Sequence, residues 1–439
     1  MQSAQEGNGH VIKDAVAAID RTRGEMVSFL SEYVRKKSVN GTIDKTAGEG
    51  ECQEWLSAKL SSWKCFDKVD IWEKAPRRPN IAAVMKGTDQ GRALGFLGHS
   101  DVVPVVEETL NQWTADPWGG EVKDGKVYGR GVCDMKGGNV AFLWAMKTLA
   151  DMGVNLRRDV YGTAVVAEET GEYDIGVDQI LQRGYRPDFV VCAEPTNFKV
   201  CPVTPGAFFF KLIVYGKAIH TSQRYKCVFP QPGTDSAPGV DAVIKTTRLI
   251  RALEELEQQW GMRKIHPLLP RGSANLTPAL IKGGEYIVAL AERCEVVYSV
   301  WFNPAQKYED TAREIRDYVT RISENDDWLR EHPPTIELPA KELPVVVHPL
   351  DVPLDHPGCK AVSSAYEASL GRRAEFDGFT AATDLNYLKL KGIPGVILGP
   401  GDISDGVHGI DEYLPIQQLV DACKVYAATI VNWCGVASR

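Results

Sequence analysis

Three apolar runs in this sequence stop abruptly at acidic residues or histidine. They read ALGFLGHSD, YGTAVVAEET and FVVCAEPT. Each has the length of a buried strand, and polar ligand residues in open α/β sheets lie just beyond the carboxyl ends of such strands. One such ending is usually a solvated loop, but three in one chain are much harder to explain in that way. The pattern therefore predicts a sheet with a polar site along one edge.

Predicted helices alternate with these strands. Apolar residues recur at helical spacing over residues 11–36, which indicates an amphipathic helix. A second helix is expected over residues 139–152, which follow Gly137 and Gly138 and end before Gly153. Further helices are expected over residues 175–183 and 416–433. The order strand, helix, strand, helix, strand is typical of an α/β fold with a mainly parallel, twisted sheet and helices on both faces.

The character of the sequence changes after residue 206. Strand-like runs such as FFFKLIVYG and CEVVYSVWF now accompany two long predicted helices, and a chain of 439 residues exceeds the size at which one core keeps growing. We therefore expect a catalytic domain that is interrupted by an inserted α+β domain. The expected boundaries are 1–206 for the first catalytic part, 207–328 for the insertion and 329–439 for the second catalytic part.

The composition and charge of the chain indicate which binding partners and which cellular location to expect. The net charge of −8 leaves no basic stripe for nucleic acid or an anionic membrane, so a small-molecule substrate is expected. The start of the chain lacks a signal-peptide pattern and no run of about 18 apolar residues occurs, which predicts a cytoplasmic protein. The ten cysteines have irregular spacings without a C-x-x-C pair, so reduced thiols are expected.

Acidic residues and histidines gathered at strand ends indicate a metal site. Without a cation, several converging carboxylates would repel one another and take up protons. Mixed imidazole and carboxylate ligands suit zinc, manganese or cobalt better than magnesium or calcium. We expect one or two divalent ions per subunit, with zinc as the first choice.

Particular residues can be assigned to this site. His99 and Asp101 form H-x-D, which puts both side chains on one face of a strand, so Asp101 can accept the second ring N–H of His99. The alternative is a buried histidine with a local partner. Asp134, in the glycine-rich GRGVCDMKGG, is either a helix N-cap or a carboxylate that bridges two ions.

Glu168 and Glu169 are adjacent, so on a regular strand they would face opposite ways. Adjacent glutamates are usually surface residues. Their position directly after the apolar run YGTAVVA favours a division between one metal ligand and one general base.

At this point the sequence resembles the family of cocatalytic metallopeptidases and deacylases that includes acetylornithine deacetylase, succinyl-diaminopimelate desuccinylase, aminoacylase, carnosinase and glutamate carboxypeptidase. Eight segments carry the resemblance in the family's order. They are GHSDVVP, WTADPWG, YGRGVCDMKGG, AEET, AEPT, GKAIHTS, ATD and GPGDISDGVHGIDEYLP.

The resemblance implies a role for each site residue. Glu168 would be the general base for a metal-bound hydroxide, and the Asp134–Met135 peptide would be cis. Asp134 would bridge the two ions. The metal ligands implied are His99 and Glu194 for one ion, Glu169 and His408 for the other, and Asp134 for both.

The insertion would be the family's dimerisation or lid domain, which implies a homodimer or a higher homo-oligomer. His220, in GKAIHTS, would then reach the active site of the partner subunit and donate a hydrogen bond to the oxyanion. The alternative is a surface histidine that follows a strand.

Two departures from the family pattern bear on the substrate. Val288 and Trp301 align with the Asn and Arg that bind amino-acid carboxylates in relatives, so the usual carboxylate clamp is altered. The leading hypothesis is hydrolysis of a C–N bond in an N-acyl amino acid or a related small amide. The alternatives are an aminohydrolase that releases ammonia from an amino-aromatic such as 5-nitroanthranilate, and a catalytically silent binding homologue.

Overall fold

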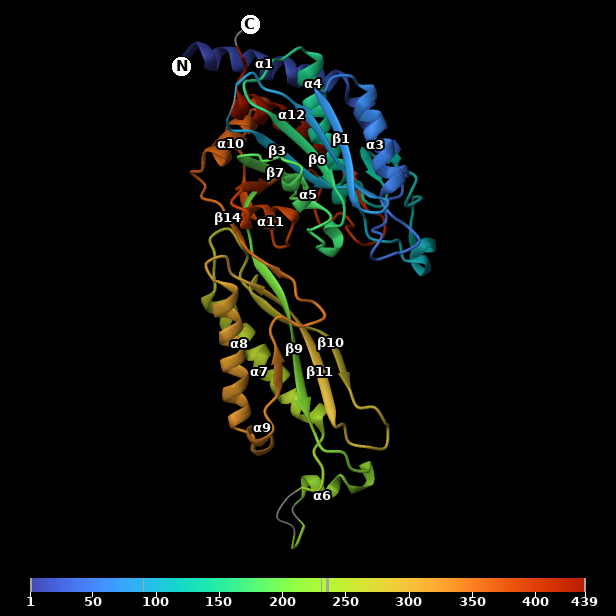
Figure 1. Ribbon diagram of the computed structural model, residues 1–439, viewed down its shortest axis with the longest axis vertical. Coiled ribbons are helices and arrows are strands. Elements are labelled where there is room, and N and C mark those ends of the chain that lie inside the picture. The colour runs from blue at the N-terminus through green and yellow to red at the C-terminus, as the bar shows by residue number, and fades with distance from the viewer. Residues whose placement is uncertain (1, 90, 230, 234–236, 438–439) are drawn as a thin grey trace. The chain divides into compact units, whose positions relative to one another are not determined.

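The computed structural model describes residues 2–89, 91–229, 231–233 and 237–437, and its two compact units are shown in Figure 1. The first unit comprises Met1–Val203, Asp351–Phe379 and Thr383–Arg439. The second comprises Thr204–Leu350 and Thr380–Ala382.

The first unit is built on a mixed sheet with a parallel centre. Its strands are β1 (Lys68–Ala75), β2 (Arg78–Met85), β3 (Leu94–His99), β6 (Val160–Val165), β7 (Phe189–Cys192), β8 (Val200–Thr204), β14 (Leu350–Asp351), β15 (Phe376–Gly378) and β16 (Gly395–Ile397). The path through the sheet is β1-β2-β6-β3-β7-β16-β8-β14, with β15 paired to β8. The pairs β6/β3, β3/β7 and β7/β16 are parallel, whereas β1/β2 and β2/β6 are antiparallel. The predicted α/β fold with a mainly parallel sheet is confirmed.

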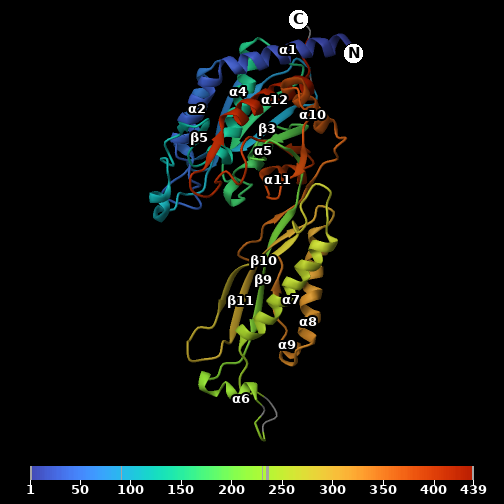
Figure 2. The same ribbon diagram turned by 180° about the vertical axis from the view of Figure 1, so that it is seen from behind.

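Helices cover both faces of this sheet. They are α1 (Gln2–Arg21), α2 (Arg23–Arg35), α3 (Gly50–Ser62), α4 (Gly137–Asp151), α5 (Val177–Gln182), α10 (Pro357–Leu370), α11 (Asp384–Leu390) and α12 (Ile416–Cys434). The connection from β3 to β6 through α4 and that from β6 to β7 through α5 run in opposite directions, so right-handed crossovers put α4 and α5 on opposite faces. Figures 1 and 2 show α12 beside α4 and α11 beside α5. No helix in the described part of the chain is long and apolar enough to cross a membrane.

The single helix predicted over residues 11–36 is wrong, because the structure breaks it at Thr22. The Thr22 hydroxyl donates to the carbonyl of Ala18 at 3.1 Å and accepts the indole N–H of Trp144 at 3.0 Å. A threonine that bonds back to the preceding turn bends a helix. The periodicity did not reveal this break, because it depends on a tryptophan far away in the sequence.

A small three-stranded sheet in the first unit joins two distant segments. It contains β4 (Glu121–Lys123), β5 (Lys126–Tyr128) and β17 (Tyr413–Pro415), in the order β17-β5-β4. Tyr128 pairs with Tyr413 in an antiparallel register. The residues just after β5 are therefore held beside the residues just before β17.

The second unit is a sheet with two long helices packed along one face. Its elements are β9 (Gly206–Tyr215), β10 (Asn275–Gly283), β11 (Arg293–Phe302), β12 (Thr335–Glu337), β13 (Val346–Val347), α6 (Tyr225–Val228), α7 (Ala242–Arg263), α8 (Tyr308–Glu324) and α9 (Asp327–Glu331). Alternate β11 side chains, from Cys294 to Phe302, are buried, as expected for a half-covered strand. This unit extends past the boundary expected at residue 328, because β12 and β13 both pair with β9.

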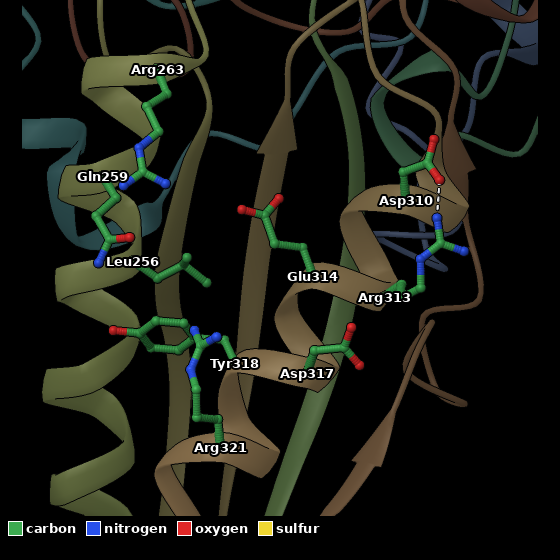
Figure 3. A pocket seen from close by; sticks show the side chains of 9 residues that line it. All are labelled: Leu256, Gln259, Arg263, Asp310, Arg313, Glu314, Asp317, Tyr318 and Arg321. Atoms are coloured by element: carbon green, nitrogen blue, oxygen red, sulfur yellow. Dashed lines mark hydrogen bonds and ion pairs between the residues drawn. The ribbon is translucent and has the colours of Figure 1, made fainter.

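A polar groove lies between α7 and α8 (Figure 3). Arg313 forms an ion pair with Asp310, and Glu314 pairs with Lys264 at 2.6 Å. Glu314 also accepts the indole N–H of Trp260 at 2.9 Å. The contacts of Glu314 therefore tie α8 to the C-terminal end of α7.

Candidate metal centre

The acidic residues and the histidine at the three predicted strand ends lie together. Strand β3 has β6 on one side and β7 on the other, all parallel, so their carboxyl ends share one edge. His99 is the last residue of β3, Glu168 and Glu169 begin the turn Glu168–Thr170 after β6, and Glu194 follows β7.

Asp134 reaches the same edge from an irregular turn, Val132–Lys136, that leads into α4. Gly131, just before the turn, has a φ of 79°, and a Cβ there would lie 2.4 Å from Cγ1 of Val102. Both the backbone conformation and the close approach require glycine. The Asp134–Met135 peptide is cis, so this part of the prediction is confirmed.

The two carboxylate oxygens of Asp134 face different histidines. Oδ1 lies 3.1 Å from Nε2 of His99, and Oδ2 lies 3.3 Å from Nε2 of His408. A further carboxylate stands beside each histidine: Glu194 Oε1 lies 3.6 Å from His99 Nε2, and Glu169 Oε2 lies 3.0 Å from His408 Nε2. Asp134 thus stands between two His–Glu pairs, as a carboxylate shared by two cations would.

Glu168 lies beside the pair formed by His99 and Glu194. Its Oε2 is 3.9 Å from Nε2 of His99. Donor atoms of His99, Glu168 and Glu194 lie within 4.8 Å of one another, and so do donor atoms of His99, Asp134 and Glu169. These imidazole nitrogens and carboxylate oxygens form the kind of donor set that suits zinc, manganese or cobalt.

The charges in this cluster are unbalanced without a cation. Burial and the neighbouring carboxylates raise the pKa of Glu194 well above its usual value. Burial would lower the pKa of His99, but Glu194, Asp134 and Glu168 outweigh it and raise that pKa. Hydrogen bonds with Asp134 and Glu169 raise the pKa of His408 to about 10. A divalent cation would offset the same repulsion while leaving both imidazoles neutral, so the residues present fit such an ion.

Asp101 lies directly behind His99, and its contacts differ in part from the expectation. Nδ1 of His99 lies 2.9 Å from the Asp101 backbone carbonyl and 3.6 Å from its carboxylate Oδ1. The backbone oxygen is therefore the nearer partner for a ring N–H. The Asp101 carboxylate accepts the backbone N–H of Glu169 at 3.1 Å, with that of Glu168 at 3.4 Å, so it fixes the turn that carries both glutamates.

Comparison with known families gives this geometry a context. The sequence model described as "Peptidase family M20/M25/M40" matches residues 95–432. The chain belongs to this family. The predicted resemblance is confirmed, and with it the assignment as a hydrolase of the M20 kind that acts on C–N bonds with a divalent metal.

Curated relatives of this M20 chain match it over nearly their whole length. The N-formyl-4-amino-5-aminomethyl-2-methylpyrimidine deformylase of Bacillus subtilis is 30% identical over 388 residues, covering 87% of this chain and 89% of that protein. The Halalkalibacterium halodurans deformylase of the same name is 28% identical over 433 residues, covering 97% and 98%. Acetylornithine deacetylase of Vibrio cholerae is 25% identical over 410 residues, covering 93% and 99%.

Solved structures share the fold of this M20 chain at low identity. The di-peptidase Dug1p of Saccharomyces cerevisiae has a TM-score of 0.70 at 15% identity, covering 97% of this chain and 99% of that one. Human carnosine dipeptidase 1 has a TM-score of 0.67 at 15% identity, covering 96% and 99%. At this identity the likeness concerns the fold.

The remaining predicted residues of this M20 chain lie in the second unit. His220 is exposed, and its Nδ1 lies 2.9 Å from Oγ of Ser222. Val288 is next to it, because its carbonyl accepts the N–H of Thr221 at 2.9 Å. Trp301 is a half-buried residue of β11. The five predicted ligands and Glu168 belong to the first unit.

Three residues that hold the centre were missed by the sequence analysis. Asn40 contacts Asp101, Glu412 accepts the backbone N–H of Asp134, and Arg130 donates to Glu412. Arg130 and Glu412 lie within segments that carry the family resemblance. The presence of an arginine in one such segment and a glutamate in another could have indicated an ion pair between them. Asn40 stands in a loop with no comparable pattern.

Proposed function

We propose that this chain hydrolyses a small N-acyl amide, with the formyl amide of an aminomethyl-substituted heteroaromatic as the first candidate substrate. The observation that carries the proposal is the Asp134 carboxylate between His99 and His408, with Glu168 beside His99. The two deformylase relatives, which match most of the chain, support the substrate class. N-acyl amino acids are the next amides to test.

The proposed roles follow from these positions. A bound divalent ion, zinc first and manganese or cobalt as alternatives, would polarise the scissile carbonyl and lower the pKa of water from about 15.7 toward about 7. Glu168 takes a proton from the attacking water and returns it to the leaving nitrogen. The residues proposed to hold one or two ions are His99, Asp134, Glu169, Glu194 and His408.

The surroundings of Glu168 suit both halves of this proton transfer. Burial raises its pKa, and the carboxylates of Glu194 and Asp384 raise it further, against the opposing effect of His99. A carboxyl group whose pKa moves toward the working pH can accept a proton and then donate it.

Glu168→Gln in metal-reconstituted protein tests the role of the base. We expect kcat to fall by about 10²- to 10⁴-fold, with metal content and circular dichroism unchanged. The exposed Glu54→Gln of α3 is the matched control and should keep wild-type turnover. A Glu168→Gln protein that keeps both its metal and full turnover would remove Glu168 from this role.

A second candidate function is favoured by Trp301. An aromatic side chain where relatives carry a cation suits a flat, weakly charged substrate, so hydrolysis of an amino-aromatic is the runner-up. A panel of formyl-aminomethylpyrimidine, N-acyl amino acids, dipeptides and amino-aromatics separates the two. Release of formate or another acid supports the amide hydrolase, whereas ammonia released from an amino-aromatic alone supports the runner-up.

We also propose a homodimer formed through the second unit. Strand β10 ends its sheet, and its side chains Leu280 and Ile281 are 67% and 59% exposed, with Ile287 beyond it 91% exposed. Apolar side chains on an end strand are a liability unless another chain covers them. The cytoplasm remains the proposed location, on the sequence grounds given above.

In this dimer His220 would donate a hydrogen bond to the oxyanion in the partner's site. Mixing His220→Ala protein with Glu168→Ala protein tests the proposal, since only mixed dimers would regain an intact site. If subunits exchange freely, half of the dimers are mixed and half of their sites are restored, so about a quarter of wild-type activity should return. No recovery under conditions of demonstrated exchange would exclude the shared site.

A further inference from the structure

Glu412 is a buried carboxylate that holds the turn of Asp134 by its backbone. Its side chain is 1% exposed. Its Oε1 accepts the N–H groups of Cys133 at 2.9 Å and Asp134 at 3.2 Å. Its Oε2 accepts the N–H of Gly131 at 3.0 Å. Three backbone donors, one just before the irregular turn and two within it, therefore converge on one side chain.

The same carboxylate is tied to the segment that carries His408. Arg130 is 3% exposed and donates from Nη1 to Oε2 of Glu412 at 2.6 Å. Its Nη2 donates to the carbonyl of Gly409, the residue after His408, at 2.8 Å. The N–H of Gly129 donates to the Glu412 backbone carbonyl at 2.9 Å, beside the pairing of β5 with β17.

These bonds fix the separation of two proposed ligands. His408 has a φ of 60°, a left-handed conformation that a residue with a side chain rarely adopts. The Asp134 backbone is also irregular, with φ −117° and ψ 93°. Neither backbone is held by regular secondary structure, so their relative position depends on the bonds to Glu412 and Arg130.

We propose that Glu412 is a positioning residue which, through Arg130, sets the spacing between Asp134 and His408 and so the affinity of the centre for the ion on the His408 side. The proposal rests on the proposed function only in that the centre binds divalent ions. Charged acceptors make the stronger hydrogen bonds to backbone N–H groups, which explains why a carboxylate is suited to a turn that presents three donors.

Glu412→Gln is the near-isosteric test. The amide has one acceptor oxygen in place of two, and its NH2 group would face a backbone N–H or the Arg130 guanidinium. Mutation of a residue that hydrogen-bonds to metal ligands, without binding the metal itself, typically lowers metal affinity 10- to 100-fold. We expect the weaker of two Zn²⁺ or Co²⁺ equivalents to bind 10- to 100-fold less tightly, with little change in the tighter one.

The matched control is Asp70→Asn. Asp70 is also a buried carboxylate held by an arginine, since Arg183 donates to it at 2.9 and 3.0 Å and Tyr185 at 2.7 Å. It contacts none of the proposed ligands. We expect Asp70→Asn to lose thermal stability but to keep wild-type metal affinity, so the control separates a general loss of stability from an effect on the metal centre.

The experiment is a titration of the metal-free, full-length protein with Zn²⁺ in competition with a chromophoric chelator. Turnover is measured as a function of the free Zn²⁺ concentration. Glu412→Gln should reach its full kcat only at 10- to 100-fold higher free Zn²⁺, and Glu412→Asp should recover part of the affinity. If Glu412→Gln does not fold, Arg130→Lys takes its place, since lysine keeps the charge but lacks the two separate guanidinium nitrogens that reach Glu412 and Gly409.

The outcomes separate the two proposals. Wild-type affinity for both ions in a folded Glu412→Gln or Arg130→Lys protein overturns the positioning role. A wild-type protein that takes up no divalent ion at all overturns the proposed function instead.

Discussion

The side-chain amide of Asn40 donates a hydrogen bond to Oδ2 of Asp101 at 2.8 Å. The same oxygen accepts the backbone N–H of Glu169 at 3.1 Å. Asn40 is fully buried, and its own Oδ1 accepts the N–H of Thr42 at 2.9 Å, which fixes which way the amide points. The turn that carries Glu168 and Glu169 is therefore braced through Asp101 by a residue that lies 61 positions before Asp101 in the chain.

Removal of this brace should weaken both metal binding and turnover. Asn40→Ala leaves Oδ2 of Asp101 with one donor fewer, so we expect kcat/KM and metal affinity to fall by about 10- to 100-fold. Asn40→Asp should be worse, because it buries a second carboxylate beside the first. Asn432→Ala is the control, since that amide only reaches the Ala361 carbonyl at 3.4 Å. Equal activity of Asn40→Ala and wild type would show that the brace is dispensable.

Much of the centre could be predicted because it follows from strand geometry. The end of a buried strand is visible in sequence as an apolar run that stops, so His99, Glu169 and Glu194 stood out. Their proximity then follows from the parallel pairing of neighbouring strands. His408 follows no comparable run and was assigned only through the family resemblance.

The bracing residues could not be predicted in this way. Glu412 and Asn40 act through hydrogen bonds to segments that are far apart from them in sequence, and no local pattern records such partners. The extent of the second unit was underestimated for a related reason. Pro-rich segments usually connect elements, but here the short strands β12 and β13 add to β9.

Loss of one partner from the buried ion pair of Arg78 with Glu49 should strongly destabilise the first unit. Arg78 donates from Nε at 3.0 Å and from Nη2 at 2.7 Å, and the side chains are 9% and 0% exposed. Arg78→Met leaves a buried carboxylate without its partner, which typically costs about 3 to 5 kcal/mol of unfolding free energy. Urea unfolding measures this change.

Two further proteins make that measurement specific. The double variant Arg78→Met with Glu49→Met should recover part of the loss, because no unpaired charge then remains buried. Lys59→Ala removes an exposed pair with Glu32 and should change stability by less than about 1 kcal/mol. A loss for Arg78→Met no larger than that for Lys59→Ala would contradict the assignment.

Asp70 should make stability depend on pH in the acid range. Hydrogen bonds from Arg183, Lys68 and Tyr185 hold the pKa of Asp70 well below its usual value, in spite of its burial. A carboxylate with a lowered folded-state pKa stabilises the protein above the unfolded-state pKa of about 3.9. That contribution is lost as the pH falls from there toward the folded-state pKa.

The measurement compares wild type with Asp70→Asn in urea across this range. We expect wild type to be more stable by about 1 to 2 kcal/mol between pH 5 and 7. This value is low for hydrogen bonds to a charged group, because Lys68 and Arg183 are about half exposed and solvent screens their charges. The difference should shrink below pH 4. A difference that grows as the pH falls would show that the sign of the effect is wrong.

Substitution of the proposed ligand Glu194 should destabilise the metal-bound protein but not the metal-free protein. Without an ion, the carboxylates of Glu194, Asp134 and Glu169 repel one another, whereas a bound ion stabilises the fold by about 4 kcal/mol at a thousand times its Kd. Chelation should therefore lower the unfolding midpoint of wild type. Glu194→Gln, which removes one charge from the cluster, should equal or exceed wild type in stability when metal-free, yet fall below it when Zn²⁺ is saturating. The measurement is the thermal unfolding midpoint of both proteins with and without chelator. If the variant has the lower midpoint in both conditions, Glu194 stabilises the fold by packing and hydrogen bonding and not through a cation.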